Sequence, residues 1–231
     1  MIGITIGDKH TYNDWGMILS SKTITPPKPK INTVSVPSGD GSIDLTETLT
    51  EDIKYEDRTL SFTFSVVDAR DTWAAKISEM QNYLQGKKLK IVCDDDPTFY
   101  YIGRVIVDSW NSDSRVGKLV IKCTVDPFKY DITSSAVEWE WDIFDFEQGI
   151  INETGELVIE GTRTITLVCR RKRMFPEFTA SSAMQVVYDG VTYNLKAGSQ
   201  KLYDIFLCEG ENELTFMGQG TIKIDYIGGS L

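Results

Sequence analysis

The stretch Thr59–Val67, TLSFTFSVV, decides the fold of this chain. Apolar and polar residues alternate in it, and side chains of a strand project with a period of two, so one face carries Leu60, Phe62, Phe64 and Val66. The same alternation, bounded by Gly, Pro, Asn and Asp, predicts further strands at 88–93, 99–107, 116–125, 137–141, 155–159, 164–169, 184–188, 191–195, 198–207, 212–216 and 221–227. The chain is therefore predicted to be mainly β.

Two local signals refine this prediction. Between residues 71 and 86 the apolar side chains follow helical spacing, which predicts one amphipathic helix that packs through Trp73, Ile77, Met80 and Leu84. Asp71 is its expected N-cap and Gly86 its expected C′ residue. Asp189-Gly190, between two predicted strands, indicates a hairpin, because a type I′ turn needs positive φ at both central positions.

Length and charge bound the organisation and the partners. The chain has 231 residues, 41% of them hydrophobic and 25% charged, with a formal net charge of -10. A phosphate-binding surface needs clustered Lys and Arg, so a nucleic-acid ligand is not expected. A polar joint near residue 134 divides the chain into predicted domains 1–134 and 135–231. The second holds 15 acidic and 8 basic residues and carries most of the negative charge.

The apolar runs, the N-terminus and the cysteines bear on the cellular location of the protein. No run approaches the roughly 20 apolar residues that span a bilayer, and the N-terminus lacks the pattern of a secretory signal. Four widely spaced cysteines lie in apolar runs, which is typical of buried free thiols in a chain made in a reducing cytoplasm: Cys93, Cys123, Cys169 and Cys208.

The sequence contains no recognisable catalytic motif. His10 is the single histidine, it lies in a polar turn, and no Gly-x-Ser-x-Gly motif accompanies it. The run 94–96, Asp-Asp-Asp, lacks the spacers and glycine of a calcium loop, so a solvated turn is favoured over a metal site. Two carboxylates far apart in the sequence could act as the catalytic pair of a glycosidase. Because the chain has 34 acidic residues, however, the presence of two such groups is no evidence for this activity. We predict no enzyme, cofactor or metal.

Two surface features of the second domain leave alternatives open. Aromatic rings of a β-sandwich can form a platform for a saccharide, and the candidates are Trp139, Trp141, Tyr188, Tyr193 and Tyr203. These rings can equally cover the core. The basic run Arg170-Arg171-Lys172-Arg173 either pairs with acidic groups on a neighbouring subunit or domain, or forms a solvated loop.

The order of several short motifs across the first 130 residues resembles a known family. The motifs are DWGMIL at 14–19, VPSGDG at 36–41 followed by Asp44, YEDR at 55–58, LQGK at 84–87, YYIGR at 100–104 and PFKY at 127–130. Together they resemble the N-terminal domain of the distal tail proteins of siphophages and prophages. The positions that carry the resemblance are Trp15, Gly16, Pro37, Gly39, Gly41, Asp44, Tyr55, Arg58, Gly86, Tyr101, Gly103, Pro127 and Phe128.

The resemblance implies an N-terminal split β-barrel with one packed helix and a C-terminal β-sandwich that is galectin-like or carbohydrate-module-like. It implies a hexameric ring in the virion tail, between the tail tube and the hub or tail-associated lysin, around a channel that passes DNA without binding it specifically. The long, mostly unpatterned stretch 20–56 is expected to be an inter-subunit arm, because loops of this length are usually functional or disordered. The alternative function is a carbohydrate-binding module or adhesin that recognises a cell-wall saccharide.

Overall fold

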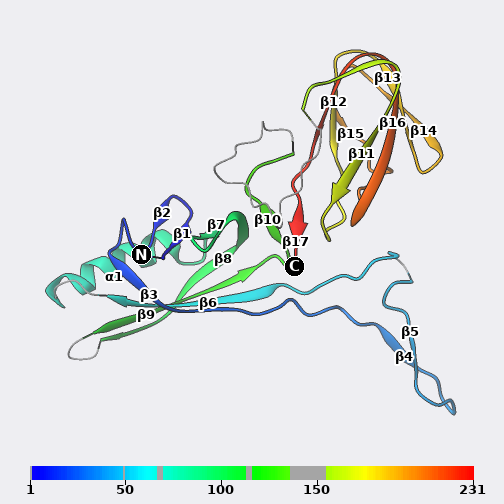
Figure 1. Cartoon of the computed structure of the whole chain (residues 1–231). Helices are drawn as coiled ribbons and strands as arrows, with labels where there is room; N and C mark the ends of the chain where they lie inside the picture. The colour runs from blue at the N-terminus through cyan, green and yellow to red at the C-terminus, as the bar shows by residue number, and fades with distance from the viewer. Residues whose placement is uncertain (1, 49, 67–69, 113–115, 136–154) are drawn as a thin grey trace. The chain divides into compact units, whose positions relative to one another are not determined.

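Two β units make up the chain in the computed structural model, which describes residues 2–48, 50–66, 70–112, 116–135 and 155–231 (Figure 1). The first unit comprises residues 1–95 and 101–127, and the second comprises 96–100 and 128–231. The division predicted between residues 134 and 135, with a ring-forming and an accessory domain, stays a prediction.

Alternating strands build the sheet of the first unit, in the order β2-β1-β7-β8-β9-β6-β3. Its strands are β1 (Ile4–Ile6), β2 (Lys9–His10), β3 (Met17–Ile24), β6 (Arg58–Val66), β7 (Lys88–Cys93), β8 (Asp96–Ser112, from residue 101 onward) and β9 (Gly117–Val125). The pairs β3–β6, β6–β9 and β8–β9 are antiparallel. The prediction that residues 20–24 are unpatterned was wrong, because β3 absorbs the polar Ser20 in a register shift and continues along β6.

A single helix in the described part of the first unit packs on this sheet. The helix α1 (Trp73–Leu84) follows the 3₁₀ turn η1 (Arg70–Thr72), and it buries the four predicted side chains. Asp71 is not the N-cap, because η1 moves the helix start to Thr72, which makes no side-chain capping bond. Gly86 has a φ of 73° just beyond the C-cap, as expected for a C′ glycine.

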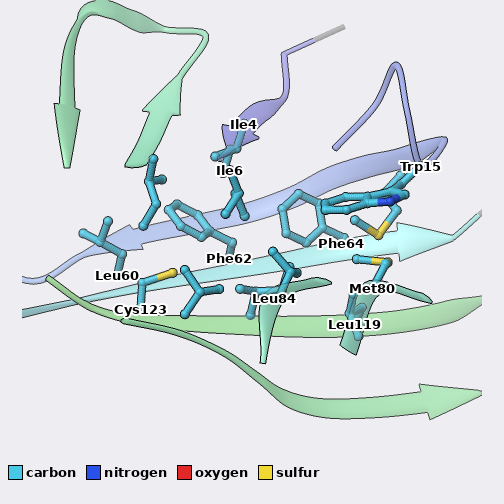
Figure 2. Close-up of a cluster of buried hydrophobic side chains, with 14 of the residues drawn as sticks. Ile4, Ile6, Trp15, Leu60, Phe62, Phe64, Met80, Leu84, Leu119 and Cys123 are labelled. Atoms are coloured by element: carbon cyan, nitrogen blue, oxygen red, sulfur yellow. The ribbon is translucent and has the colours of Figure 1, made fainter. Parts of the chain in front are cut away.

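The core of the first unit lies between α1 and the inner face of the sheet. Figure 2 shows Met80 and Leu84 of the helix gathered with Phe62, Phe64 and Trp15. The predicted apolar face of β6 is buried throughout, with relative exposures of 0–1%. The strand β6 therefore lies at the centre of this core.

The segment between β3 and β6 forms no part of this core. It carries a small antiparallel hairpin of its own, β4 (Thr33–Ser35) and β5 (Ser42–Asp44), that pairs with no other described strand. In Figure 1 this hairpin lies at the end of two extended chain segments that leave the sheet of the first unit. We call residues 25–57 the arm.

The second unit is also built from strands. They follow the order β14-β13-β16-β12-β15, with β11 also paired to β16, and their bounds are β11 (Leu157–Cys169), β12 (Glu177–Ala180), β13 (Met184–Tyr188), β14 (Val191–Leu195), β15 (Gly198–Lys201) and β16 (Gly210–Asp225). Beyond its glycines Gly218 and Gly220, β16 exchanges partner β13 for β12. The strands thereby enclose one buried cluster that includes Phe178 and Phe216.

A small sheet joins distant segments of the second unit. The strand β10 (Lys129–Asp131) pairs with Phe99 and Tyr100 at the start of β8 on one side and with β17 (Gly229–Ser230) on the other. Residues far apart in the sequence therefore meet around β10.

Some predicted boundaries in the second unit were wrong. The strands predicted at 155–159 and 164–169 are one strand, β11, because Gly161 (φ 84°) faces Gly218 and the pairing continues through them. The strands predicted at 212–216 and 221–227 likewise merge into β16, since residues 218–220 stay paired with β11. The strand predicted at 198–207 ends at Lys201, where a turn closed by the Ile205 N–H to the Leu202 carbonyl begins. Asp189 and Gly190 have the positive φ values, 48° and 74°, that the predicted hairpin requires. The strand predicted at 137–141 lies outside the described residues.

Three of the four cysteines match the prediction of buried thiols, whereas Cys208 is only half-buried, since it lies in the connection before β16. Burial raises the pKa of Cys123 to about 12 and that of Cys169 to about 11, which opposes formation of a reactive thiolate. In the part of the chain that the structure describes, no helix has the length and apolarity to cross a membrane.

Candidate functional site

The arm is an exposed feature of the first unit. Every residue from Lys28 to Asp44 is exposed. Its two extended segments touch through backbone bonds from Lys30 N–H to the Lys54 carbonyl and from Glu56 N–H to the Lys28 carbonyl, both 2.8 Å. A two-stranded hairpin is marginally stable in water by itself. The described contacts of the arm outside its hairpin are therefore few.

Several positions of the family resemblance lie in this arm. Pro37, Gly39 and Gly41 form the turn between β4 and β5, and Gly41 has a φ of 77°, which favours glycine. Asp44 ends β5, and its carboxylate accepts a 2.9 Å hydrogen bond from the Thr46 N–H. Tyr55 faces Pro29 in an isolated bridge at the base of the arm.

Arg58 begins β6 where the arm joins the sheet, and it is only 5% exposed. Its guanidinium carbon lies 5.5 Å from the centre of the Tyr101 ring. Burial lowers the pKa of Arg58, and Tyr101 partly opposes this effect. Among the described residues, Nε and Nη2 of Arg58 have no hydrogen-bond partner. A buried guanidinium without full pairing costs stability, so Arg58 is expected to destabilise the fold at the base of the arm.

The other positions of the resemblance support the sheet. A Cβ on Gly103 would lie 2.2 Å from the Thr124 carbonyl oxygen, so only glycine allows β8 and β9 to approach there. Gly16 has a φ of 61° in the turn before β3. Trp15 packs edge-on against Tyr83, with ring centres 5.7 Å apart. Pro127 and Phe128, both half-buried, follow β9.

The aspartate turn is occupied by cationic and backbone donors. Asp94 Oδ2 accepts a 2.6 Å bond from the Gly3 N–H and lies 3.1 Å from His10 Nε2, while Asp95 pairs with Lys22 at 2.5 Å. Asp96, in the second unit, pairs with Lys129. Across the described ranges, no three potential metal-ligating side chains gather into one group. The geometry therefore favours a structural turn.

His10 takes part in this turn through both ring nitrogens. Its Nδ1 accepts hydrogen bonds from the N–H groups of Tyr12 (3.2 Å) and Asn13 (3.0 Å). An acceptor nitrogen carries no proton, so the neutral ring holds its proton on Nε2 and donates to Asp94. Nδ1 thus holds the turn after β2, and Nε2 joins His10 to Asp94 at the end of β7.

The basic run of residues 170–173 finds its partners inside the second unit. Arg170 Nε lies 3.0 Å from Asp131 Oδ1, and its guanidinium and the Lys129 ammonium lie 4.8 and 3.9 Å from the centre of the Phe99 ring. Burial raises the pKa of Asp131, and Arg170 opposes this rise. The rest of the run contacts Glu209 through Arg171 (2.7 Å), Tyr130 through Lys172 (3.2 Å) and the Phe206 ring through Arg173. The run therefore pairs with acidic groups, and one of them, Asp131, precedes the predicted division at residue 134. Contact of this run with a neighbouring subunit stays a prediction.

Of the candidate saccharide-binding aromatics, the structure describes Tyr188, Tyr193 and Tyr203. Trp139 and Trp141 lie outside the described residues. Tyr188 and Tyr193 pack at the edge of the core, and the Tyr188 hydroxyl donates to the Phe206 carbonyl. Tyr203 is exposed, at 73%. A saccharide site at these residues stays a prediction.

Two surface features were not predicted from the sequence. Phe175 packs against Tyr203 with ring centres 5.8 Å apart, although Phe175 lies in no predicted strand. Ile106 is 39% exposed in the middle of β8 and lies opposite Lys122 of β9 in the strand register. Its position in an alternating strand could have revealed this, because residues 105 and 106 must face opposite sides of the sheet.

Comparison with known proteins identifies the lineage of this fold. A family model described as a phage tail protein RIFT-related domain matches residues 7–125. The fold is similar to the crystal structure of the SPP1 Dit (gp 19.1) protein, described as a paradigm of the hub adsorption apparatus in phages that infect Gram-positive bacteria. That likeness has a TM-score of 0.59 at 13% identity and covers 98% of this chain and 99% of the other. No curated protein matches the chain.

These matches confirm the resemblance to siphophage distal tail proteins and the mainly β fold that it implied. The family model covers more than half of the chain, including the arm and nearly all of the first unit. The chain belongs to the family of phage tail proteins that carry the RIFT-related domain.

Proposed function

We propose that this tail protein forms a hexameric ring at the distal end of a long non-contractile tail and links the tail tube to the hub or tail-associated lysin. The observation that carries the proposal is the fold likeness to Dit over both units, together with the family match of the first unit. On this proposal the chain acts structurally, without catalysis, in a virion tail assembled in the host cytoplasm, and DNA passes through its channel without specific binding.

The first unit offers surfaces suited to a ring. A ring needs head-to-tail contacts that close on themselves. In the described residues, β3 lies at one end of the strand order and β2 at the other, so each has one side open to pairing. The exposed arm adds a second surface that can reach a neighbour. Edge strands and arm together supply two different sides of the same subunit.

Assembly with the tail-tube and hub proteins tests the proposal. We expect the purified chain, mixed with both partners, to give six-fold rings at the end of tubes by negative-stain microscopy and a matching mass by light scattering. Gold-labelled antibodies against the chain should mark the tail tip of virions. A chain that stays monomeric with both partners present, and that antibodies do not find on tails, would overturn it.

A further inference from the structure

Two exposed aromatic rings extend one strand pair of the second unit. The strands β12 and β15 are antiparallel, with Glu177 opposite Lys201. Phe175 lies two residues before Glu177, and Tyr203 lies two residues after Lys201, so the same register brings them together, with ring centres 5.8 Å apart. Steps of two residues keep side chains on one face of a strand pair. Phe175 is 44% exposed and Tyr203 is 73% exposed, and we call them the aromatic pair.

The next outward positions of β12 and β15 carry polar side chains that hold one another in place. The Ser199 hydroxyl donates to Glu177 Oε1 at 2.5 Å and lies 3.0 Å from the Thr179 hydroxyl. Lys201 Nζ lies 3.6 Å from Glu177 Oε2. The bond from Ser199 and the charge of Lys201 lower the pKa of Glu177, so this group is a carboxylate at neutral pH. These polar groups therefore have defined orientations before any ligand binds.

The aromatic pair and the polar groups beside it match the two kinds of surface that a pyranose sugar has. The C–H groups of the sugar ring form an apolar face, which packs on an aromatic ring because the face of that ring carries partial negative charge. The hydroxyl groups at its rim both donate and accept hydrogen bonds. The Glu177 carboxylate is an acceptor and the Lys201 ammonium a donor, so both can bind hydroxyls of a sugar that rests on the aromatic pair.

The size and charge of this surface favour a small neutral ligand. A standard protein interface buries about 800 Å² on each partner around an apolar centre, whereas on β12 and β15 the outward positions next to the aromatic pair are charged or hydroxylated. The charges of Glu177 and Lys201 balance each other. The two aromatic rings are inclined by 59°, so they form no flat platform for a row of sugars. One sugar residue, with its face on one ring and its edge against the other, suits this geometry.

We propose that the outer face of β12 and β15 binds a neutral saccharide through Phe175 and Tyr203, with Glu177 and Lys201 as its hydrogen-bonding groups. A few placed polar groups beside aromatic side chains are typical of sites for small ligands. Of the described aromatic residues predicted from the sequence for such a site, Tyr203 alone belongs to this one. The inference goes beyond the proposed function, because the site lies within the second unit and needs no ring.

Binding to an array of neutral bacterial polysaccharides tests the site. We expect the purified chain to bind at least one polymer of hexose or N-acetylhexosamine. With a hexasaccharide of that polymer, saturation-transfer NMR should show ring protons of the sugar close to aromatic protons of the protein. A chain that binds none of these polymers, and none of their hexasaccharides with a Kd below about 1 mM, would overturn the inference.

Substitutions separate the aromatic contact from the polar one. Phe175→Ala and Tyr203→Ala should each weaken binding about tenfold, because each removes one ring. Tyr203→Phe keeps the ring and should stay within about twofold of the wild type, whereas Glu177→Gln should weaken binding about three- to tenfold by removing the charged acceptor. Tyr12→Ala, at a tyrosine of the first unit that is 36% exposed, is the matched control and should have no effect. Circular dichroism and thermal melting establish that each variant is folded. Unchanged binding in a folded Tyr203→Ala variant would contradict the site.

Photocrosslinking distinguishes a saccharide from a protein that covers the same face. We would place p-benzoylphenylalanine at Tyr203 and irradiate the chain with the tail-tube protein, the hub protein and the bound hexasaccharide together. Adducts with the saccharide are expected, whereas adducts with the tube protein, the hub protein or a second copy would overturn the inference. A chain that binds the saccharide but forms no ring would remove the proposed function alone. Rings from a chain that binds no saccharide would remove this inference alone.

Discussion

The strand β6 and the hairpin β4–β5 belong to the same unit, yet they differ in what holds them. The apolar side chains of β6 are at most 1% exposed. The strands β3 and β9 pair with β6 on its two sides. The hairpin has one strand pair and an apolar face in solvent. β6 is stabilised by the core that it helps to form, whereas the hairpin has no core.

This difference separates folding from assembly within one unit. Burial of apolar side chains is the dominant favourable contribution to folding, so the sheet folds from its own residues. The arm contributes little to that free energy, because its apolar side chains Val34 and Ile43 stay exposed. Changes in the two regions should therefore affect different measurements.

The largest contrast is expected from truncating one apolar side chain in each region. Phe64→Ala should lower the free energy of unfolding by about 3–5 kcal/mol, because it removes a fully buried ring and leaves a cavity. Val34→Ala should change it by less than about 0.5 kcal/mol, since Val34 is exposed. Chemical denaturation followed by tryptophan fluorescence measures both. An equal loss in the two variants would mean that the hairpin is already covered in the free chain.

Replacing Arg58, where the arm joins the sheet, should raise the free energy of unfolding rather than lower it. Arg58→Met keeps the volume and removes a buried charge that lacks full pairing, so the free energy of unfolding should rise by about 1 kcal/mol. Lys118→Met, an exposed cation on β9, is the matched control and should be close to neutral. A clear loss of stability in Arg58→Met would show that its contact with Tyr101 outweighs the cost of burial. Loss of ring formation in a more stable variant would assign Arg58 to assembly.

The sheet could be predicted from sequence because its residues obey a simple period. Alternation placed β6, β7, β13 and β14 within one residue of their bounds, and helical spacing identified the four buried side chains of α1. The continuous β11 and β16 could not be found, because facing glycines with positive φ look like turns in one dimension.

Contacts between residues far apart in the sequence could not be predicted either. The run of residues 170–173 meets Asp131 and Phe99 only because β10 joins segments far apart in the chain. The arm was anticipated from its length, but its hairpin is too short for a periodic signal.

Removing the hairpin should affect stability less than either substitution in the sheet. Leu45 N–H donates to the Asn32 carbonyl at 2.8 Å, so residues 33–44 can be replaced by Asn-Gly with little movement of the remaining arm. Shortening a loop by this amount changes its closure free energy by only about 0.3 kcal/mol. The melting temperature should stay within about 2 °C of the wild type, whereas ring formation should be lost. Unfolding of the shortened chain would contradict the independence of the two regions.

The smallest effect lies within the hairpin and concerns protonation. Hydrogen bonds from the Thr46 side chain and backbone lower the pKa of Asp44 below its ordinary value of 3.8. A carboxyl group whose pKa is lowered by structure stabilises that structure above its unfolded pKa, and the contribution is lost as the pH falls through the lowered value. Acidification should therefore release the end of β5 only below the usual range of aspartate, which the chemical shift of the Thr46 amide follows by NMR. Thr46→Val should move the midpoint upward but not fully to the ordinary value, because the backbone bond remains, and Thr46→Ser should keep it low. An Asp44 midpoint at the ordinary value in the wild type would mean that the hairpin does not hold this geometry in the free chain and takes it up only against a partner.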